Sequence, residues 1–104
     1  MTDSEYHQLA DAVFKRVEET VDGAETVIDC DRKGGSVLEL SFENGSQIIV
    51  NKQAPMQEIW VAAKAGGFHY GWKDGAWRSA RDGSELLADL SRFISEQAGE
   101  TVTF

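Results

Sequence analysis

The chain opens with a helical pattern. Between Ser4 and Val21, apolar residues recur at steps of three and four positions and would line one face of an α-helix. These positions are Tyr6, Leu9, Ala10, Val13, Val17 and Val21. Ser4, or Asp3 just before it, is a suitable N-cap residue for this helix. The helix should pack on a core through its apolar face and present its charged residues to solvent.

After Gly23 the pattern alternates with a period of two, as in β-strands. In the segment VIDCD, Ile28 and Cys30 should point toward the core, and Asp29 and Asp31 should point away from it. We expect Cys30 to be an inert, buried small hydrophobe. This first strand would continue the acidic surface of the preceding helix.

The segment SVLELSF-ENG-SQIIVN predicts a β-hairpin. A two-residue Asn44-Gly45 loop would place Leu40 opposite Ile49 and would mix polar and apolar faces. A three-residue loop, with Gly45 in the left-handed conformation of a bulged turn, pairs Leu40 with Ile48 instead. Because this register keeps one face apolar, we favour the three-residue loop.

Two further alternating segments follow. In QEIWVAA, Ile59 lies on the core face and Trp60 on the opposite face. After GGFHYGW, a two-residue Asp74-Gly75 turn should bring Trp72 opposite Trp77. These segments complete a set of about six short antiparallel strands.

The segment DGSELLADLSRFISEQAG predicts a second helix, with Asp82 and Glu85 as a capping pair and Gly99 as its end. Its apolar positions are Leu86, Leu87, Leu90, Phe93 and Ile94. The closing TVTF alternates and should cover the seam beside the helices. The order helix, strands, helix predicts an α+β fold: a two-layer sandwich with both helices on one sheet face and the other face open to water.

Length and composition favour one soluble domain spanning residues 1–104. A chain of 104 residues that is 41% hydrophobic can form one core. No apolar run approaches the roughly 20 residues that span a bilayer, and the N-terminal residues are acidic where a secretory signal is basic. The single cysteine cannot form an intramolecular disulfide. We therefore expect a cytoplasmic protein with no membrane partner.

Negative charge is concentrated in the first third of the chain. Residues 1–31 hold nine acidic and two basic residues, a net charge of −7, whereas the remaining residues hold nine acidic and eight basic residues. We call the following residues the acidic ridge: Glu18, Glu19, Asp22, Asp29 and Asp31. A field of this sign repels nucleic acid and attracts metal cations and basic protein surfaces.

Catalytic chemistry finds little support among the residues. His7 and His69 belong to distant elements, no glycine-rich phosphate loop follows a strand, and no His/Cys spacing fits a structural zinc site. The acidic ridge, however, offers hard oxygen ligands suited to weak, exchangeable binding of iron, manganese, magnesium or calcium. Its alternative interpretation is a solvated face that aids solubility. The repulsion between like charges at four-residue spacing, as for Glu18 and Asp22, argues for a cation or a basic partner.

Trp60 is the second candidate. Alternation places its indole on the uncovered sheet face together with Asn51 and His69, which is typical of a protein-contact patch. The alternative is that the parity is shifted by one residue and Trp60 belongs to the core.

The stretch NGSQIIVNKQAPMQEIWVAAKAGGFHYGW, with the acidic N-terminal helix before it and AGETVTF after it, resembles the frataxin family, in particular its bacterial CyaY-type members. The resemblance runs nearly from end to end. It implies an α-β-α sandwich that binds ferrous and ferric iron weakly on the acidic ridge and acts in iron-sulfur cluster assembly. It further implies contact with a cysteine desulfurase and a scaffold protein. Asn51, Gln53 and Trp60 match the family's exposed sheet patch, and His69 matches its bacterial form.

The first functional hypothesis is a non-enzymatic adaptor or regulator, a monomer whose Glu18, Glu19 and Asp22 dock on the desulfurase while its ridge binds iron. The first alternative is an iron-storage protein or ferroxidase that oligomerises with iron. The second is an acidic inhibitor that mimics nucleic acid, which would make no use of Trp60.

Overall fold

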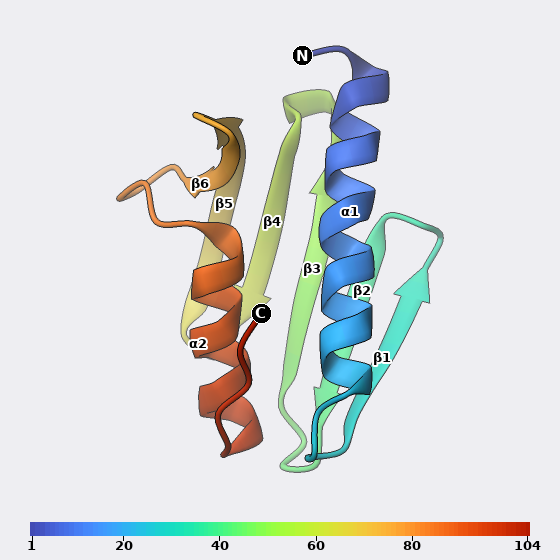
Figure 1. Cartoon of the computed structure of the whole chain (residues 1–104), viewed down its shortest axis with the longest axis vertical. Helices are drawn as coiled ribbons and strands as arrows, with labels where there is room; N and C mark the ends of the chain where they lie inside the picture. Colours follow the sequence, from blue (N-terminus) through green and yellow to red (C-terminus); the bar gives the residue numbers. More distant parts are fainter.

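The computed structural model describes all residues from Met1 to Phe104. Its elements are α1 (Asp3–Asp22), β1 (Ile28–Lys33), β2 (Val37–Phe42), β3 (Gln47–Gln53), the 3-10 turn η1 (Ala54–Met56), β4 (Glu58–Ala63), β5 (Gly66–Lys73), β6 (Ala76–Ser79) and α2 (Leu86–Ala98). The six strands form one antiparallel sheet in the order of the sequence. Both helices lie on the same face of that sheet (Figure 1), which confirms the predicted α+β two-layer fold.

Helix α1 begins earlier than the sequence pattern predicted. Its N-cap is Thr2, whose hydroxyl accepts a hydrogen bond from the Glu5 amide at 3.1 Å. The Glu5 carboxylate in turn accepts from the Thr2 amide at 3.1 Å. The prediction of Ser4 or Asp3 as N-cap was wrong because only Thr2 has a glutamate three residues later to complete this reciprocal capping box.

Both predicted hairpin turns are present. Leu40 pairs with Ile48, and Gly45 has φ +86°, as expected for the three-residue loop. Trp72 pairs with Trp77 across a two-residue turn. Asp74 and Gly75 both have positive φ in that turn, at 53° and 77°, as a type I′ hairpin requires.

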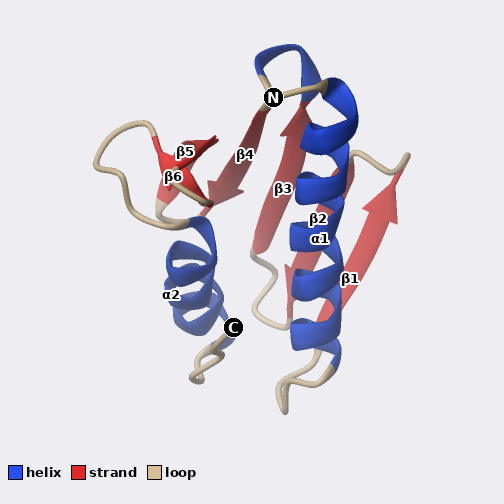
Figure 2. Cartoon of the chain, turned by 45° about the horizontal axis from the view of Figure 1, so that its top comes forward, coloured by secondary structure: helices blue, strands red, loops and turns tan.

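The core lies between the helices and the sheet (Figure 2) and contains twenty buried apolar residues. The closing TVTF segment adds Val102, which is buried, and Phe104, which packs against the core. The Val102 backbone both donates to and accepts from the Ser95 hydroxyl, at 2.9 and 3.1 Å. These bonds hold the segment beside α2, in agreement with its predicted covering role.

The start of α2 differs from the predicted capping pair. Glu85 alone is the N-cap, and its carboxylate accepts from the amides of Leu87 and Ala88. Asp82 instead accepts from the backbone within the preceding turn. Gly99 ends the helix in the left-handed conformation, with φ 75°, as predicted.

Two polar residues occupy the buried side of α2 that the apolar pattern did not include. Asp89 and Gln97 are 4% and 6% exposed. Gln97 accepts from the Lys64 amide at 3.0 Å and donates to the Ser46 hydroxyl at 3.0 Å. It thereby fastens the end of α2 to two turns of the sheet.

Candidate functional site

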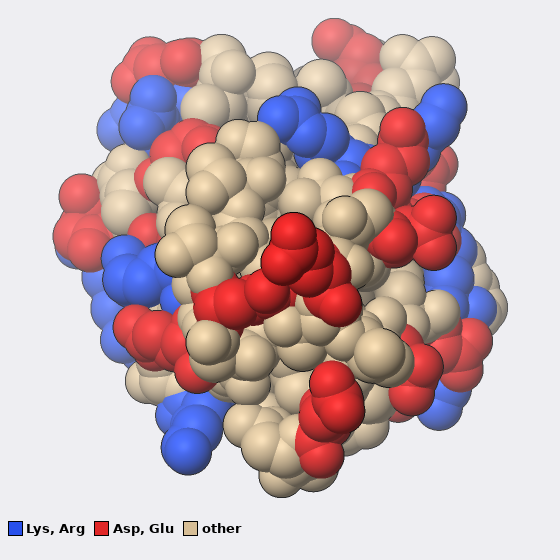
Figure 3. Space-filling model, turned by 60° about the horizontal axis from the view of Figure 1, so that its bottom comes forward, with Lys and Arg blue, Asp and Glu red and all other residues tan.

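The acidic ridge is built by the last turns of α1 and by strand β1. Glu18, Glu19 and Asp22 from the helix and Asp29 from the strand line one surface concavity of about 430 Å³. Asp31 lies two residues farther along β1 and is not part of this lining. Viewed from the end of the molecule where α1 terminates, acidic side chains occupy the centre of the surface and basic ones lie mainly toward its rim (Figure 3). The fold thus gathers acids from two elements.

This concavity is an open set of carboxylates and not a preformed cage. No group of three His, Cys, Asp or Glu side chains is close enough together to hold a metal ion. Carboxylate oxygens are nevertheless the ligands that hard cations such as iron prefer over softer donors. The donor set therefore offers oxygen ligands of the type that iron accepts, without the convergent geometry of a closed site.

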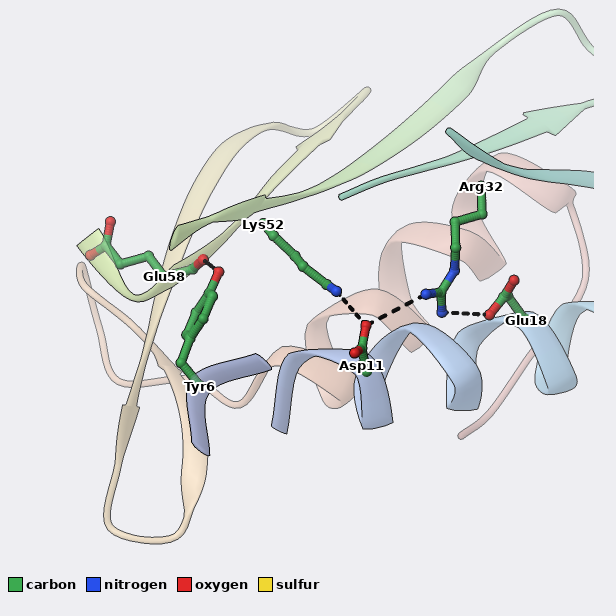
Figure 4. Close-up of polar contacts among 6 residues, drawn as sticks. All are labelled: Tyr6, Asp11, Glu18, Arg32, Lys52 and Glu58. Carbon is green, nitrogen blue, oxygen red and sulfur yellow. Dashed lines mark hydrogen bonds and ion pairs between the residues drawn. The ribbon is translucent and has the colours of Figure 1, made fainter. Parts of the chain in front are cut away.

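The ridge is partly neutralised from within the protein. Glu18 forms an ion pair with Arg32 at 2.8 Å. Arg32 also lies 3.5 Å from Asp11, which forms a second ion pair with Lys52 (Figure 4). Asp11 and Glu18 lie on the solvent-facing side of α1, as expected, but the pattern did not predict that basic side chains from the sheet would pair with them. The hydrogen bond from Lys52 is the main cause that lowers the pKa of the Asp11 carboxyl below its usual range.

The remaining ridge carboxylates are free. Glu19, Asp22, Asp29 and Asp31 form no ion pair. A docking surface or a cation would therefore meet these four groups first.

Lys52 and Arg32 are residues that the sequence pattern did not single out. Each places its cationic group 5.1 Å from the centre of the Phe14 ring, a cation–π arrangement. The Lys52 side chain is only 7% exposed. Lys52 follows two residues after Val50 on an alternating strand, so it lies on the core side of β3. This alternation could have predicted the buried position of Lys52 from the sequence.

Cys30 is exposed, which corrects the prediction of a buried cysteine. It pairs with Leu40 and so shares the helix-facing side of the sheet, as the alternation indicated. Strand β1 is the edge strand, however, and α1 does not cover it fully. Partial burial of the thiol, followed by the nearby Glu18 charge, raises the pKa of Cys30 to about 11. At neutral pH the thiol keeps its proton and is neither a ready nucleophile nor a thiolate ligand.

The residues of the predicted sheet patch lie on the open face. Asn51 pairs with Trp60, and Trp60 pairs with His69, so their side chains form a row across β3, β4 and β5. The rings of Trp60 and His69 stack at 4.2 Å with an interplanar angle of 6°. The Trp60 indole donates to the Glu58 carboxylate at 2.8 Å. Gln53 follows two residues after Asn51 on the same face.

Trp60 is half-buried by these neighbours and lies outside the core cluster. The alternative interpretation of Trp60 as a core residue was therefore wrong. Its stacking partner and hydrogen bond hold the indole in a fixed orientation on the open sheet face.

The chain is similar to known proteins over nearly its whole length. A frataxin-like domain model matches residues 1–100. The iron-sulfur cluster assembly protein CyaY of Paraburkholderia phymatum is 52% identical to this chain, and the match covers 98% of this chain and 96% of that protein. The protein of the same name from Burkholderia mallei is also 52% identical, and the match covers 100% of this chain and 98% of that protein.

Solved structures agree with the sequence comparisons. Frataxin from Psychromonas ingrahamii superposes with a TM-score of 0.90 at 40% identity, covering 99% of this chain and 97% of that one. A trimeric frataxin from Saccharomyces cerevisiae in a ferrous complex superposes with a TM-score of 0.74 at 23% identity, covering 92% and 87%, and shows the shared fold. The family match over residues 1–100 and the relatives at 52% identity establish that this chain belongs to the frataxin family.

Proposed function

We propose that this protein is a non-catalytic, iron-binding adaptor or regulator of iron-sulfur cluster assembly that acts in the cytoplasm. The name of its relatives at 52% identity, iron-sulfur cluster assembly protein CyaY, supports the process. Neither helix combines the length and the apolarity needed to cross a membrane.

The observation that carries the proposal is the convergence of acids from α1 and β1 on one concavity. Its free carboxylates dock on a basic surface of a cysteine desulfurase by salt-sensitive steering. Ferrous or ferric iron binds the same carboxylates weakly and exchangeably, and competes with the desulfurase or bridges to it. The absence of a convergent ligand set gives no support to the alternative of an iron-storage protein or ferroxidase.

The open sheet face supplies the second contact. Asn51, Gln53, Trp60 and His69 bind the scaffold protein, while the ridge remains available to the desulfurase. A monomer suffices for this role, because one chain carries both surfaces and needs no second copy to complete either of them.

Amide-resolved NMR titration tests the proposal. Ferrous iron under anaerobic conditions, and the desulfurase in a separate titration, should each perturb the amides of the last turns of α1 and of β1. Sodium chloride at matched ionic strength serves as the control for ionic strength. Perturbations confined to other elements in both titrations would refute the shared use of the acidic ridge.

Replacing Trp60 with alanine should weaken binding of the scaffold protein about tenfold or more, because a central aromatic residue often dominates a contact patch. Stability should change less, since Trp60 lies outside the core cluster. Calorimetric titration and thermal melting measure the two effects. Trp72→Ala is the matched control, because Trp72 is 37% exposed but lies away from the Trp60 row. A large fall in melting temperature with unchanged binding would contradict the contact role.

A further inference from the structure

An apolar groove lies on the helix side of the molecule, away from the acidic ridge and the open sheet face. It has a volume of about 470 Å³ and runs between α1, the β5–β6 hairpin and the start of α2. Its main apolar residues are Leu9, Val13, Trp72, Trp77 and Leu87. Helix α2 lies beside the lower part of β5 and does not extend to the β5–β6 hairpin end (Figure 1). This volume falls in the range of small-molecule sites, roughly 300–1,000 Å³.

Trp77 brings an unused hydrogen-bond donor to this groove. Its side chain is 3% exposed, and its indole Nε1 is the only buried side-chain nitrogen or oxygen without a hydrogen-bond partner. Buried donors are paired in the great majority of cases. A ligand in the groove that supplies an acceptor would satisfy this donor, which is reached only when a neighbouring side chain moves, because Nε1 is itself buried.

The charges at the groove favour an anionic acceptor. Two charged residues line it, Arg16 and Glu85. The Glu85 carboxylate is occupied by the amides of Leu87 and Ala88 at the start of α2. Arg16 forms no ion pair. The formal charges of Arg16 and Glu85 cancel, and the Arg16 guanidinium is the one charged group of the lining without a partner in the protein.

We propose that this groove binds a small amphipathic carboxylate. The apolar body of the ligand packs between Leu9, Val13 and Leu87. One carboxylate oxygen accepts from the Trp77 indole, and the other pairs with the Arg16 guanidinium. Trp72 is 37% exposed and packs edge-on against Trp77 with ring centroids 5.5 Å apart. Movement of this exposed indole gives the carboxylate access to the buried donor.

Indole resonances of the full-length chain provide a direct test, with octanoate as the probe. The protein has three tryptophans; the Trp77 indole N–H should shift downfield in a saturable way as it gains an acceptor, and the Trp72 resonance should change with it because its ring moves. The chemical shift of the Trp60 indole N–H should not change, because this indole already donates to Glu58. 1-Octanol and octylammonium, which share the alkyl chain but lack the carboxylate, should bind at least tenfold more weakly.

Matched variants separate the carboxylate contacts from general apolar binding. Arg16→Gln should raise the dissociation constant of octanoate about tenfold, as expected for loss of one charge-assisted contact. Lys15→Gln removes a neighbouring cation that does not line the groove. This substitution should change the dissociation constant of octanoate by no more than about twofold. Trp77→Phe keeps an aromatic ring and removes only the donor, and should also weaken binding.

Three results would overturn the proposal. The first is the absence of a saturable shift at Trp77. The second is binding of 1-octanol as tight as that of octanoate, which would indicate an unspecific apolar surface. The third is a concentration-dependent shift of the same resonance without any ligand, which would make the groove a contact between two copies of the chain.

Discussion

Replacing Glu19 and Asp22 with lysine is expected to weaken binding of the desulfurase about a hundredfold while making the protein more stable. Both residues lie in the last turn of α1, which contains no basic residue. The C-terminal end of a helix carries partial negative charge, so an acid there is unfavourable and a lysine favourable by roughly 0.3–1 kcal/mol each. The loss of binding follows from reversing two free carboxylates at a salt-sensitive docking surface.

Glu18 is left out of this variant for a structural reason. Because Glu18 is paired with Arg32 at 2.8 Å, a lysine at this position would place two cations together and would disturb the contact between α1 and β1. A change in binding could then reflect a change in structure. The double variant touches only carboxylates that have no ion pair.

The matched control compares Glu19→Lys with Glu96→Lys. Glu19 and Glu96 are both exposed, both lie in the last turn of a helix, and neither forms an ion pair. Each substitution changes the net charge by the same amount. Calorimetry at low and high salt should show about a tenfold loss for Glu19→Lys and a change within about twofold for Glu96→Lys. Equal losses would assign the effect to total charge and remove the ridge from the mechanism.

Under the proposed function, this helix end gives up stability for a concentrated negative surface. A helix-end acid has the same cost at Glu96, but the ridge brings three unpaired acids, Glu19, Asp22 and Asp29, into one concavity, which solubility alone does not require. This is the physical argument against regarding the ridge as a merely solvated face.

Alternation and turn residues predicted most of the sheet. An Asn-Gly and an Asp-Gly pair fix the positive φ angles of two hairpins, and one-residue shifts in register would have moved Leu40 or Trp77 out of the core. The side of the sheet on which Trp60 and His69 lie followed from the same parity.

Other features depend on how the elements pack in space, and a local pattern does not contain this information. The exposure of Cys30 depends on how far α1 extends over an edge strand. The pairing of Glu18 with Arg32 joins residues fourteen positions apart in different elements. Asp89 looks like a solvent-facing acid within the α2 pattern because its partners, Tyr70 and Ser84, come from other segments.

Replacing Asp89 with alanine should destabilise the fold by about 3 kcal/mol, because the buried groups that donate to its carboxylate would lose their hydrogen-bond acceptor. One oxygen of Asp89 accepts from the Tyr70 hydroxyl and from the Ser84 hydroxyl, both at 2.7 Å. Its other oxygen lies 3.4 Å from Arg92. Removing the carboxylate leaves the buried Tyr70 hydroxyl without an acceptor and disconnects β5 from α2.

Thermal melting of a small series measures this effect. A loss of about 3 kcal/mol corresponds to roughly 10–20 °C in a domain of this size. Asp89→Asn keeps one acceptor oxygen and should cost less than alanine, whereas Glu96→Ala, on the exposed side of the same helix, should change stability by less than about 0.5 kcal/mol. A change as small for Asp89→Ala as for Glu96→Ala would contradict a stabilising role for the network.

The network also predicts a loss of stability at alkaline pH. Burial, and then the hydrogen bond to Asp89, raise the pKa of the Tyr70 hydroxyl far above its ordinary value. In the unfolded chain a tyrosine loses its proton near pH 10, so above that pH the unfolded state binds fewer protons than the folded state. The free energy of unfolding should therefore fall as the pH rises above about 10. Tyr70→Phe should be less stable than the wild type at neutral pH, and its free energy of unfolding should fall less as the pH rises. Denaturant titrations at neutral and alkaline pH would show whether the free energies of unfolding of the two proteins converge.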